Sequence, residues 1–479
     1  MKTYPFLLAV ATTLLQTSNA IPTKTVKRTE IEQRDLISNV LGAVNSVASG
    51  AVSSGNPYST LLSALKSVTP TASPAGVSQA SATLSSIMNA SPTPTNIYGT
   101  IAELVGAGLT PNNVNSILNA VNGGLTGQNS EINVNLRNPS PAVFPKASSS
   151  DAPYDLTEAQ LRAAIYIPST FKYGASGAPQ PVILVPGTGD TGYTTFIGNY
   201  IPLLTGSSFA DPVWLNIPGY LLNDAQTNAE YVAYAINYIY GISNKRKVGV
   251  IGWSQGNIDT QWAFKYWPST RSKTTDHIAF SPDYHGTILA NFVAAPGEPL
   301  PPSVLQQEYN SNFISTLRRN NGDSAYVPTT TVYSGFFDEI VEPQQGTGAS
   351  AFLNDARGVG VSNNEVQTVC AGQAAGTFYT HEGTLYNPLG YALVQDALTH
   401  DGPGQTSRLS LGSVCNNYLT PGLDLSGFLL TENSIAIAGL AIIVYPNKVL
   451  VEPAIKSKYQ NACYECFLLT VLVGYAASS

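Results

Sequence analysis

Residues 248–256 constrain the fold of this chain more than any other segment does. They read Val-Gly-Val-Ile-Gly-Trp-Ser-Gln-Gly, a short apolar strand that passes directly into a Gly-x-Ser-x-Gly pattern centred on Ser254. Residues 257–267 follow with Ile258 and Trp262 four positions apart, which is the spacing of a helix face. Strand, sharp turn and helix are the setting in which such a serine projects above a sheet. Small residues flank it because larger side chains two positions away would clash.

Beyond residue 151 the pattern of short apolar runs and helical stripes repeats. A capping box at Thr157 and Gln160 opens a short helix, and Asp224 caps a longer one. Strands alternating with helices predict an α/β fold, with a mostly parallel sheet covered on both faces. We expect residues 151–479 to form one domain, with strands at 182–185, 213–217, 248–251, 277–280 and 330–334.

The first twenty residues have the composition of a secretory signal. Lys2 supplies a positive start, residues 6–15 an apolar run, and residues 18–20 a small-residue cleavage site. The apolar run is too short to span a bilayer, so we expect a secreted protein. Lys27-Arg28 is either a second processing site or a pair of solvated charges.

Residues 21–150 differ in character from the rest. They are rich in Ser, Ala, Asn and Val and contain several helical stripes, the clearest at residues 114–121. We predict a helical pro-region or accessory segment without chemistry of its own. The most apolar later stretch, residues 435–445, is followed by Pro446 and preceded by Glu432. It predicts an amphipathic or core helix, and we expect no transmembrane segment in the mature chain.

Charge and cysteine content agree with secretion. The net charge of −7, with 11% charged residues, argues against nucleic-acid binding. Cys370 and Cys415 are the expected disulfide. The Cys463-x-x-Cys466 pair fits a local disulfide, a redox motif or half of a zinc site, but the other zinc ligands are missing. A structural role is therefore expected, with no metal or cofactor.

A serine hydroxyl becomes a strong nucleophile when a histidine takes its proton. In the chain order nucleophile, acid, base, the histidine comes last. His277 and His285 lie too close behind Ser254 for that order. Two later histidines, His381 and His400, both stand in loop-like surroundings, and order alone leaves the choice between them open.

The acid of such a site follows a later strand. Residues 330–334 are that strand, and Gly335-Phe-Phe precedes Asp338, with Glu339 as the alternative acid. An oxyanion needs two donors. The amide of Gln255 is one, and the loop at residues 186–189 offers a second at Thr188. Neither a lysine nor a Gly-x-Gly-x-x-Gly pattern follows that loop, which argues against nucleotide binding.

Five motifs in order, within residues 152–425, resemble the Candida antarctica lipase B-like family of secreted fungal lipases. They are Leu184–Gly189, Leu222–Gln226, Trp253–Gly256, Ala279–Tyr284 and Asp338–Val341. The resemblance implies an α/β-hydrolase fold with Ser254 as nucleophile, Asp338 as acid, His381 as base, and oxyanion donors at Thr188 and Gln255.

The resemblance also implies three substrate contacts. Trp253 would form the floor of a small pocket for the alcohol part of the ester. Asp283 and Gln307 would line the polar part of the cleft. The chain departs from the family in its long N-terminal extension, in its apolar C-terminal end, and in lacking a cysteine pair near the start of the catalytic domain. The helix at residues 435–445, which would border the acyl entrance, does not align cleanly.

The expected function is a secreted, monomeric serine hydrolase that cleaves carboxylic esters of lipids or small molecules through an acyl-enzyme, as a lipase does. A short-chain or polyester-directed esterase is the nearest alternative. An alternative of another class is a catalytically silent, hydrolase-like domain that binds a surface through its N-terminal helices.

Overall fold

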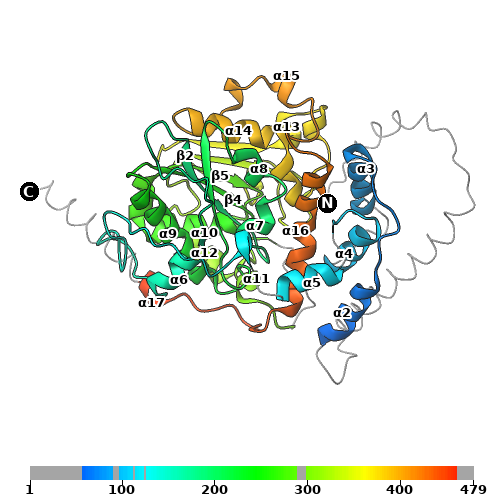
Figure 1. The fold of residues 1–479 in the computed structure, drawn as a ribbon, viewed down its shortest axis with the longest axis horizontal. Coiled ribbons are helices and arrows are strands. Elements are labelled where there is room, and N and C mark those ends of the chain that lie inside the picture. The colour runs from blue at the N-terminus through cyan, green and yellow to red at the C-terminus, as the bar shows by residue number, and fades with distance from the viewer. Residues whose placement is uncertain (1–56, 90–96, 112–113, 123–125, 288–297, 461–479) are drawn as a thin grey trace, which may run out of the picture.

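The computed structural model describes residues 57–89, 97–111, 114–122, 126–287 and 298–460. The signal segment, the dibasic pair at residues 27–28, and Cys463 with Cys466 lie outside the described residues. Figure 1 shows the α/β body and a group of N-terminal helices at its side.

A seven-stranded sheet forms the centre of the described part, in the order β1-β3-β2-β4-β5-β6-β7. The pair β1–β3 is antiparallel, and every other neighbouring pair is parallel. The predicted mostly parallel sheet is thereby confirmed. The strands are β1 Ile165–Tyr166, β2 Gln180–Val185, β3 Ala210–Leu215, β4 Val248–Trp253, β5 Thr274–Phe280, β6 Thr329–Tyr333 and β7 Val361–Glu365.

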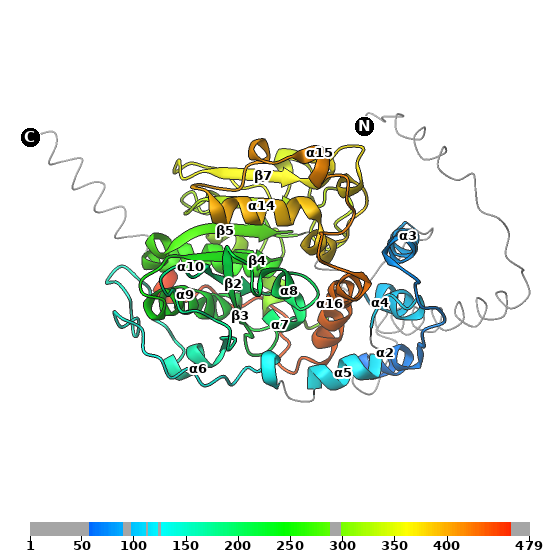
Figure 2. The same cartoon turned by 45° about the horizontal axis from the view of Figure 1, so that its top comes forward.

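Helices cover both faces of the sheet (Figure 2). Along β2, Val182 and Leu184 face one apolar core, whereas Ile183 and Val185 face the other, as the two-residue period of a strand requires. The predicted capping box at Thr157 is present. The helices of this body are α6 Glu158–Ala163, α7 Gly192–Phe196, α8 Tyr200–Leu204, α9 Ala225–Ile242, α10 Gln255–Tyr266, α11 Pro302–Gln306, α12 Asn312–Arg318, α13 Val366–Val369, α14 Pro388–Thr399, α15 Leu411–Val414, α16 Leu425–Val444 and α17 Ser457–Gln460.

Helix α16 is longer than the sequence suggested. The predicted apolar stretch began at residue 435, but the helix starts at Leu425 and carries Glu432 and Asn433 as buried residues in its interior. The polar pair looked like a boundary, yet its side chains lie inside the protein. By length and composition α16 could cross a membrane, but 83% of its most apolar window is buried in the structure. It is a core helix.

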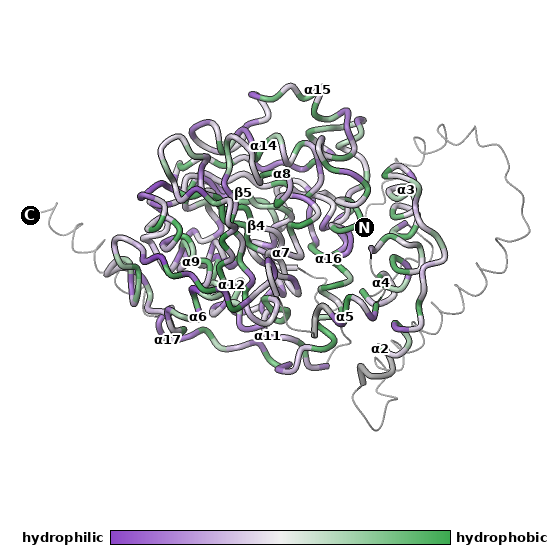
Figure 3. Tube along the Cα trace, viewed as in Figure 1, coloured by the Kyte–Doolittle hydropathy of each residue, from purple (hydrophilic) through white to green (hydrophobic). Residues whose placement is uncertain are grey.

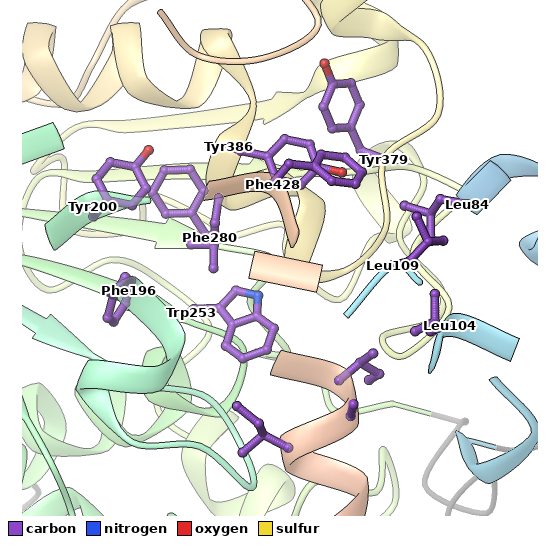
Figure 4. Close-up of a cluster of buried hydrophobic side chains, with 14 of the residues drawn as sticks. Leu84, Leu104, Leu109, Phe196, Tyr200, Trp253, Phe280, Tyr379, Tyr386 and Phe428 are labelled. Atoms are coloured by element: carbon purple, nitrogen blue, oxygen red, sulfur yellow. The ribbon is translucent and has the colours of Figure 1, made fainter. Parts of the chain in front are cut away.

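Two of the four described N-terminal helices pack against α16. The four are α2 Pro57–Ser67, α3 Val77–Met88, α4 Ile97–Gly106 and α5 Val114–Asn122, and α5 coincides with the clearest predicted stripe. Helices α4 and α5 contact α16, and α2 and α3 pack on those two. Figure 3 shows apolar residues of α4, α5 and α16 close together. Residues from the sheet, such as Trp253, and from these helices, such as Leu104, belong to one apolar cluster around α16 (Figure 4).

The approach of α4 to α16 depends on a small residue. A Cβ atom at Gly439 would lie 2.5 Å from Cδ1 of Ile101, a distance that real Cβ atoms do not show. Downstream of α5, residues 126–150 bond to the α/β body instead. The indole of Trp214 donates to the carbonyl of Gln128 at 2.8 Å, and the hydroxyl of Tyr238 donates to that of Arg137 at 2.7 Å.

The expected disulfide between Cys370 and Cys415 is present, with both cysteines fully buried. The bridge follows α13 and α15, and it spans 45 positions of sequence. His381 lies inside the loop that it closes. The disulfide therefore anchors both ends of the segment that carries this histidine.

We predict that Ile101→Ala destabilises the whole molecule by about 2–4 kcal/mol, because it opens a cavity between α4 and α16. Denaturant unfolding followed by tryptophan fluorescence should show one transition at lower denaturant. The control Asn119→Ala, on an exposed position of α5, should change the stability by less than about 0.5 kcal/mol. A separate, early transition of the N-terminal helices would contradict a shared core.

Candidate active site

Ser254 occupies a strained turn between β4 and α10. Its φ of 53° and ψ of −130° place a non-glycine residue in a region that L-residues rarely adopt. The flanking glycines are required by space. A Cβ at Gly252 would lie 2.3 Å from Oδ1 of Asn257, and one at Gly256 would lie 2.4 Å from the carbonyl oxygen of Pro186. The strand, turn and helix expected around Ser254 are therefore all present.

Asp338 and His381 meet as a buried pair. The Nδ1 atom of His381 lies 2.9 Å from Oδ2 and 3.0 Å from Oδ1 of Asp338, and the two side chains are 2% and 0% exposed. Backbone amides of Ile340 and Val341 donate to Oδ1 of the same carboxylate and fix its position. Within the described residues, Nε2 of His381 has no hydrogen-bond partner, so this nitrogen is available to a nucleophile or a substrate.

The residue before the nucleophile touches the histidine. The ring of Trp253 lies 5.1 Å from that of His381, and its indole N–H donates to the His381 carbonyl at 3.2 Å. The hydroxyl of Ser281 donates to the same carbonyl at 2.9 Å. The end of β4 and the His381 loop are therefore joined directly, which brings Ser254 and His381 into one site.

Several charges set the pKa of His381. Burial alone lowers it, but the carboxylate of Asp338, through its charge and hydrogen bond, acts in the opposite direction. Glu339 and Asp283 add to that effect, so the pKa lies above the ordinary 6.5. Asp283 is itself fully buried, its carboxylate oxygens have no partner in another described residue, and burial raises its pKa to about 7.

The loop after β2 lies directly against the serine. A Cβ at Gly187 would lie 2.5 Å from the Trp253 ring and 3.0 Å from Cβ of Ser254. The Thr188 hydroxyl lies 2.9 Å from the side-chain oxygens of both Gln255 and Gln307. Gln255 begins α10, so its amide is among the free donors at a helix start. The loop and the helix start thus converge beside Ser254.

The other histidines serve structure. His277 is buried in β5 beside Oδ1 of Asn257 at 3.2 Å, and burial lowers its pKa to about 3. Burial likewise lowers the pKa of His285 to about 4. His400 ends α14 and pairs with Asp396 at 3.1 Å. Of the two late histidines that chain order left open, the structure brings His381 to Asp338.

Three acidic residues near His381 were not predicted as a group. Glu339, the alternative acid, accepts a hydrogen bond from the backbone amide of His381 at 3.0 Å instead of binding its ring. Glu382 and Glu432 are fully buried close by. One sequence signal was available, because Glu432 is the sole charged residue of the otherwise apolar α16.

A serine on a strained strand-to-helix turn, a buried Asp–His pair, and a mostly parallel sheet together define an α/β-hydrolase with a serine-hydrolase site. In the described residues, no group of three or more His, Cys, Asp or Glu side chains is arranged to hold a metal ion. No protein-family model matches the chain.

Two lipases B are among the known proteins that are similar to it. The chain is 34% identical to lipase B of Pseudozyma antarctica over 317 residues, which cover 64% of this chain and 86% of that protein. The crystal structure of Aspergillus fumigatus lipase B superposes with a TM-score of 0.79 at 45% identity, covering 88% of this chain and 99% of the other. The chain belongs to the lipase B family and is a lipase-like carboxylic ester hydrolase.

Asp338→Asn should lower kcat by about 10⁴-fold while leaving the fold intact, because the amide reverses the hydrogen bond that sets the His381 tautomer. Steady-state ester hydrolysis, with circular dichroism as the folding check, measures this. His400→Ala serves as the control and should keep wild-type turnover, since His400 contacts Asp396 on another part of the protein. Near-normal turnover in Asp338→Asn would exclude this pair as the catalytic acid and base.

The raised pKa of His381 predicts the acid side of the pH profile. A general base must be neutral, so kcat/KM should fall as the pH drops through a value above 6.5. Hydrolysis of an uncharged ester between pH 4 and 9 measures it. Any activity left in Asp338→Asn should titrate at lower pH, because the charge that favours the imidazolium is gone. A wild-type midpoint below 6.5 would contradict this assignment.

Proposed function

We propose that Ser254, His381 and Asp338 hydrolyse acylglycerol esters through an acyl-enzyme. The observation that carries this proposal is the buried pair of Asp338 and His381, whose Oδ2 and Nδ1 atoms lie 2.9 Å apart. In the described residues Nε2 of the same imidazole has no hydrogen-bond partner, and Ser254 has the strained φ of 53°. Formation of an acyl-enzyme requires a serine hydroxyl that projects above the sheet and an imidazole that is already oriented before the substrate binds. The strained turn at Ser254 and the Asp338–His381 pair provide these two features.

In the first half-reaction, Oγ of Ser254 attacks the ester carbonyl while Nε2 of His381 takes its proton. The resulting oxyanion accepts hydrogen bonds from the amide of Gln255 and from Thr188. The imidazolium, stabilised by Asp338, then returns the proton to the departing alcohol. Water, activated by the same histidine, attacks the acyl-enzyme and releases the acid.

Substrate contacts are proposed for three further residues. Trp253 floors the alcohol-side pocket, a role supported by its burial beside the His381 ring. Gln307 lies within 3.1 Å of the Gln255 side chain, which favours a position at the oxyanion side of the cleft. Asp283, whose raised pKa makes it a potential donor near neutral pH, lines the polar part of the cleft.

The proposal extends to the whole chain. A signal at residues 1–20 directs secretion, residues 21–150 form an accessory segment, and residues 151–479 form the catalytic domain. Within the described part of the accessory segment, α4 and α5 lie against α16. The protein acts as a monomer on lipid or small ester substrates, and the mechanism requires no cofactor. The lipase B relatives support an ester substrate.

The test is hydrolysis of p-nitrophenyl esters from acetate to palmitate by the secreted chain and by its Ser254→Ala variant. We expect activity that reaches the long acyl chains and is lost in the variant by about 10⁴-fold or more. His381→Ala should be equally impaired. Activity confined to acetate and butyrate would instead indicate a short-chain esterase.

Labelling with a serine-directed phosphonate separates the enzyme from a catalytically silent binding domain. Stoichiometric labelling of the wild type, absent in Ser254→Ala, supports the enzyme. A folded wild-type chain that neither hydrolyses the esters nor takes up the label would overturn the proposed mechanism. Turnover that survives in His381→Ala and is lost in His400→Ala would assign the base to His400.

A further inference from the structure

Three glutamates gather behind the backbone of His381. Glu339 follows Asp338 in the chain, Glu382 follows His381, and Glu432 reaches in from α16. Glu382 and Glu432 are fully buried, and Oε1 of the partly buried Glu339 is shielded from solvent. We call these three residues the glutamate cluster. It meets His381 through the backbone amide, whereas Asp338 binds the imidazole ring.

The cluster contacts the His381 segment directly. Oε2 of Glu339 accepts the His381 amide at 3.0 Å. Oε1 of Glu432 accepts hydrogen bonds from the hydroxyls of Tyr386 at 2.8 Å and Thr380 at 3.1 Å. The residues on both sides of the histidine are therefore attached to a single carboxyl group on α16.

Full ionisation of the cluster is physically unfavourable. In the described residues, no lysine or arginine forms an ion pair with any of the three carboxyl groups. If all three were ionised, four buried oxygens would lack a donor, namely Oε1 of Glu339, both oxygens of Glu382 and Oε2 of Glu432. Buried carboxylates without partners take up protons instead. A protonated Glu382 that donates to Glu432 supplies one of the missing hydrogen bonds.

The groups around the cluster act in both directions. The charge of Asp338 raises the pKa of Glu339, and Asp283 adds negative charge beside the imidazole when it is ionised, whereas the hydrogen bond from Tyr386 lowers the pKa of Glu432. Tyr386 and Tyr418 face the cluster from the segments before α14 and α16, and they are neutral hydroxyls. When its imidazole is protonated, His381 is a cation beside the cluster, and its charge lowers the pKa of Glu339. Burial raises the pKa of all three glutamates, and the charges of Glu339 and Glu432 raise that of Glu382 further.

We propose that Glu339, Glu382 and Glu432 form a proton-sharing carboxyl cluster that positions His381. This inference rests on the proposed role of His381 as the base. With a proton shared between Glu382 and Glu432, the segment around the histidine is bonded to α16. When that proton is lost, the like charges repel, the attachment to α16 weakens, and the added negative charge favours the imidazolium.

The direction of the stability effect follows from linkage. Each glutamate has a folded-state pKa above its value in the unfolded chain, so its contribution to stability is complete below about pH 4.5. That contribution is lost as the pH rises through the folded-state pKa. Replacing a member with glutamine removes the titration while keeping a group that can donate and accept hydrogen bonds. The gain from the substitution should therefore appear at high pH.

The test compares the full-length wild type with Glu382→Gln and Glu432→Gln. We expect each variant to raise Tm at pH 8 by about 3 °C or more, with little change at pH 5. The acid limb of kcat/KM should move to lower pH by roughly half a unit or more in Glu339→Gln, because Glu339 is the cluster member whose charge raises the pKa of His381. It should stay in place in Glu382→Gln, whose carboxyl group is already neutral there. The plateau kcat should stay within about threefold of wild type.

Glu452→Gln is the matched control. It removes one carboxylate that accepts from Asn312, while its amide can still accept that bond. It should shift neither the acid limb nor the pH dependence of Tm. Equal Tm losses at pH 5 and pH 8 in the cluster variants would mean that the glutamates serve as ordinary hydrogen-bond acceptors, which would overturn the proposal.

A spectroscopic measurement keeps the test valid even if a variant folds poorly. Wild-type protein at pH 7 should show the infrared carbonyl band of a protonated carboxylic acid, weakened in Glu382→Gln. Absence of the band would refute the shared proton. If wild type hydrolyses no ester but the infrared and Tm results appear, the proposed function fails and the cluster stands. If the enzyme is active but lacks these signatures, the cluster fails and the proposed function stands.

Discussion

The close approach of two backbone segments at the carboxyl edge of the sheet determines the rest of the site. A side chain at Gly256 would meet the carbonyl of Pro186 at 2.4 Å, and one at Gly187 would meet Cβ of Ser254 at 3.0 Å. Because β2 and β4 are adjacent parallel strands, their ends lie side by side. The same contacts therefore fix both the position of Ser254 and the position of the loop that carries Thr188. Loss of either glycine would force the two segments apart.

Asp338 and His381 reach that edge by different means. Asp338 follows the end of β6, and β6 lies two strands away from β4 in the sheet. The sheet therefore places Asp338 at the same edge as Ser254. His381 comes from a loop and depends on packing from outside the sheet. Its carbonyl is held by Trp253 and its neighbours by Glu432, and the disulfide closes the segment around it. His381 is consequently the residue of the site that depends most on the helical layer.

Local features were readable from sequence, whereas features made by distant contacts were not. The turn at Ser254, five of the seven strands and the capping box at Thr157 follow from neighbouring residues and were anticipated. The edge strands β1 and β7 were not predicted. The choice between His381 and His400 is a matter of which one meets Asp338, and chain order cannot supply that. The start of α16 was misjudged because Glu432 looks like a solvated boundary residue until its partners, all far away in sequence, are known.

Helix α16 links two parts of the molecule that the sequence treats as unrelated. Gly439 admits the side chain of Ile101 from the N-terminal helices, and seven residues earlier Glu432 holds the segment around His381. A packed helix moves as a unit because interiors at crystal-like density do not compress locally. A shift of α16 at its contact with Ile101 therefore also changes its contact with the segment around His381, and the reverse holds as well. Helix α16, with Glu432 as its one ionisable residue, thus couples the position of His381 to the packing of the N-terminal helices.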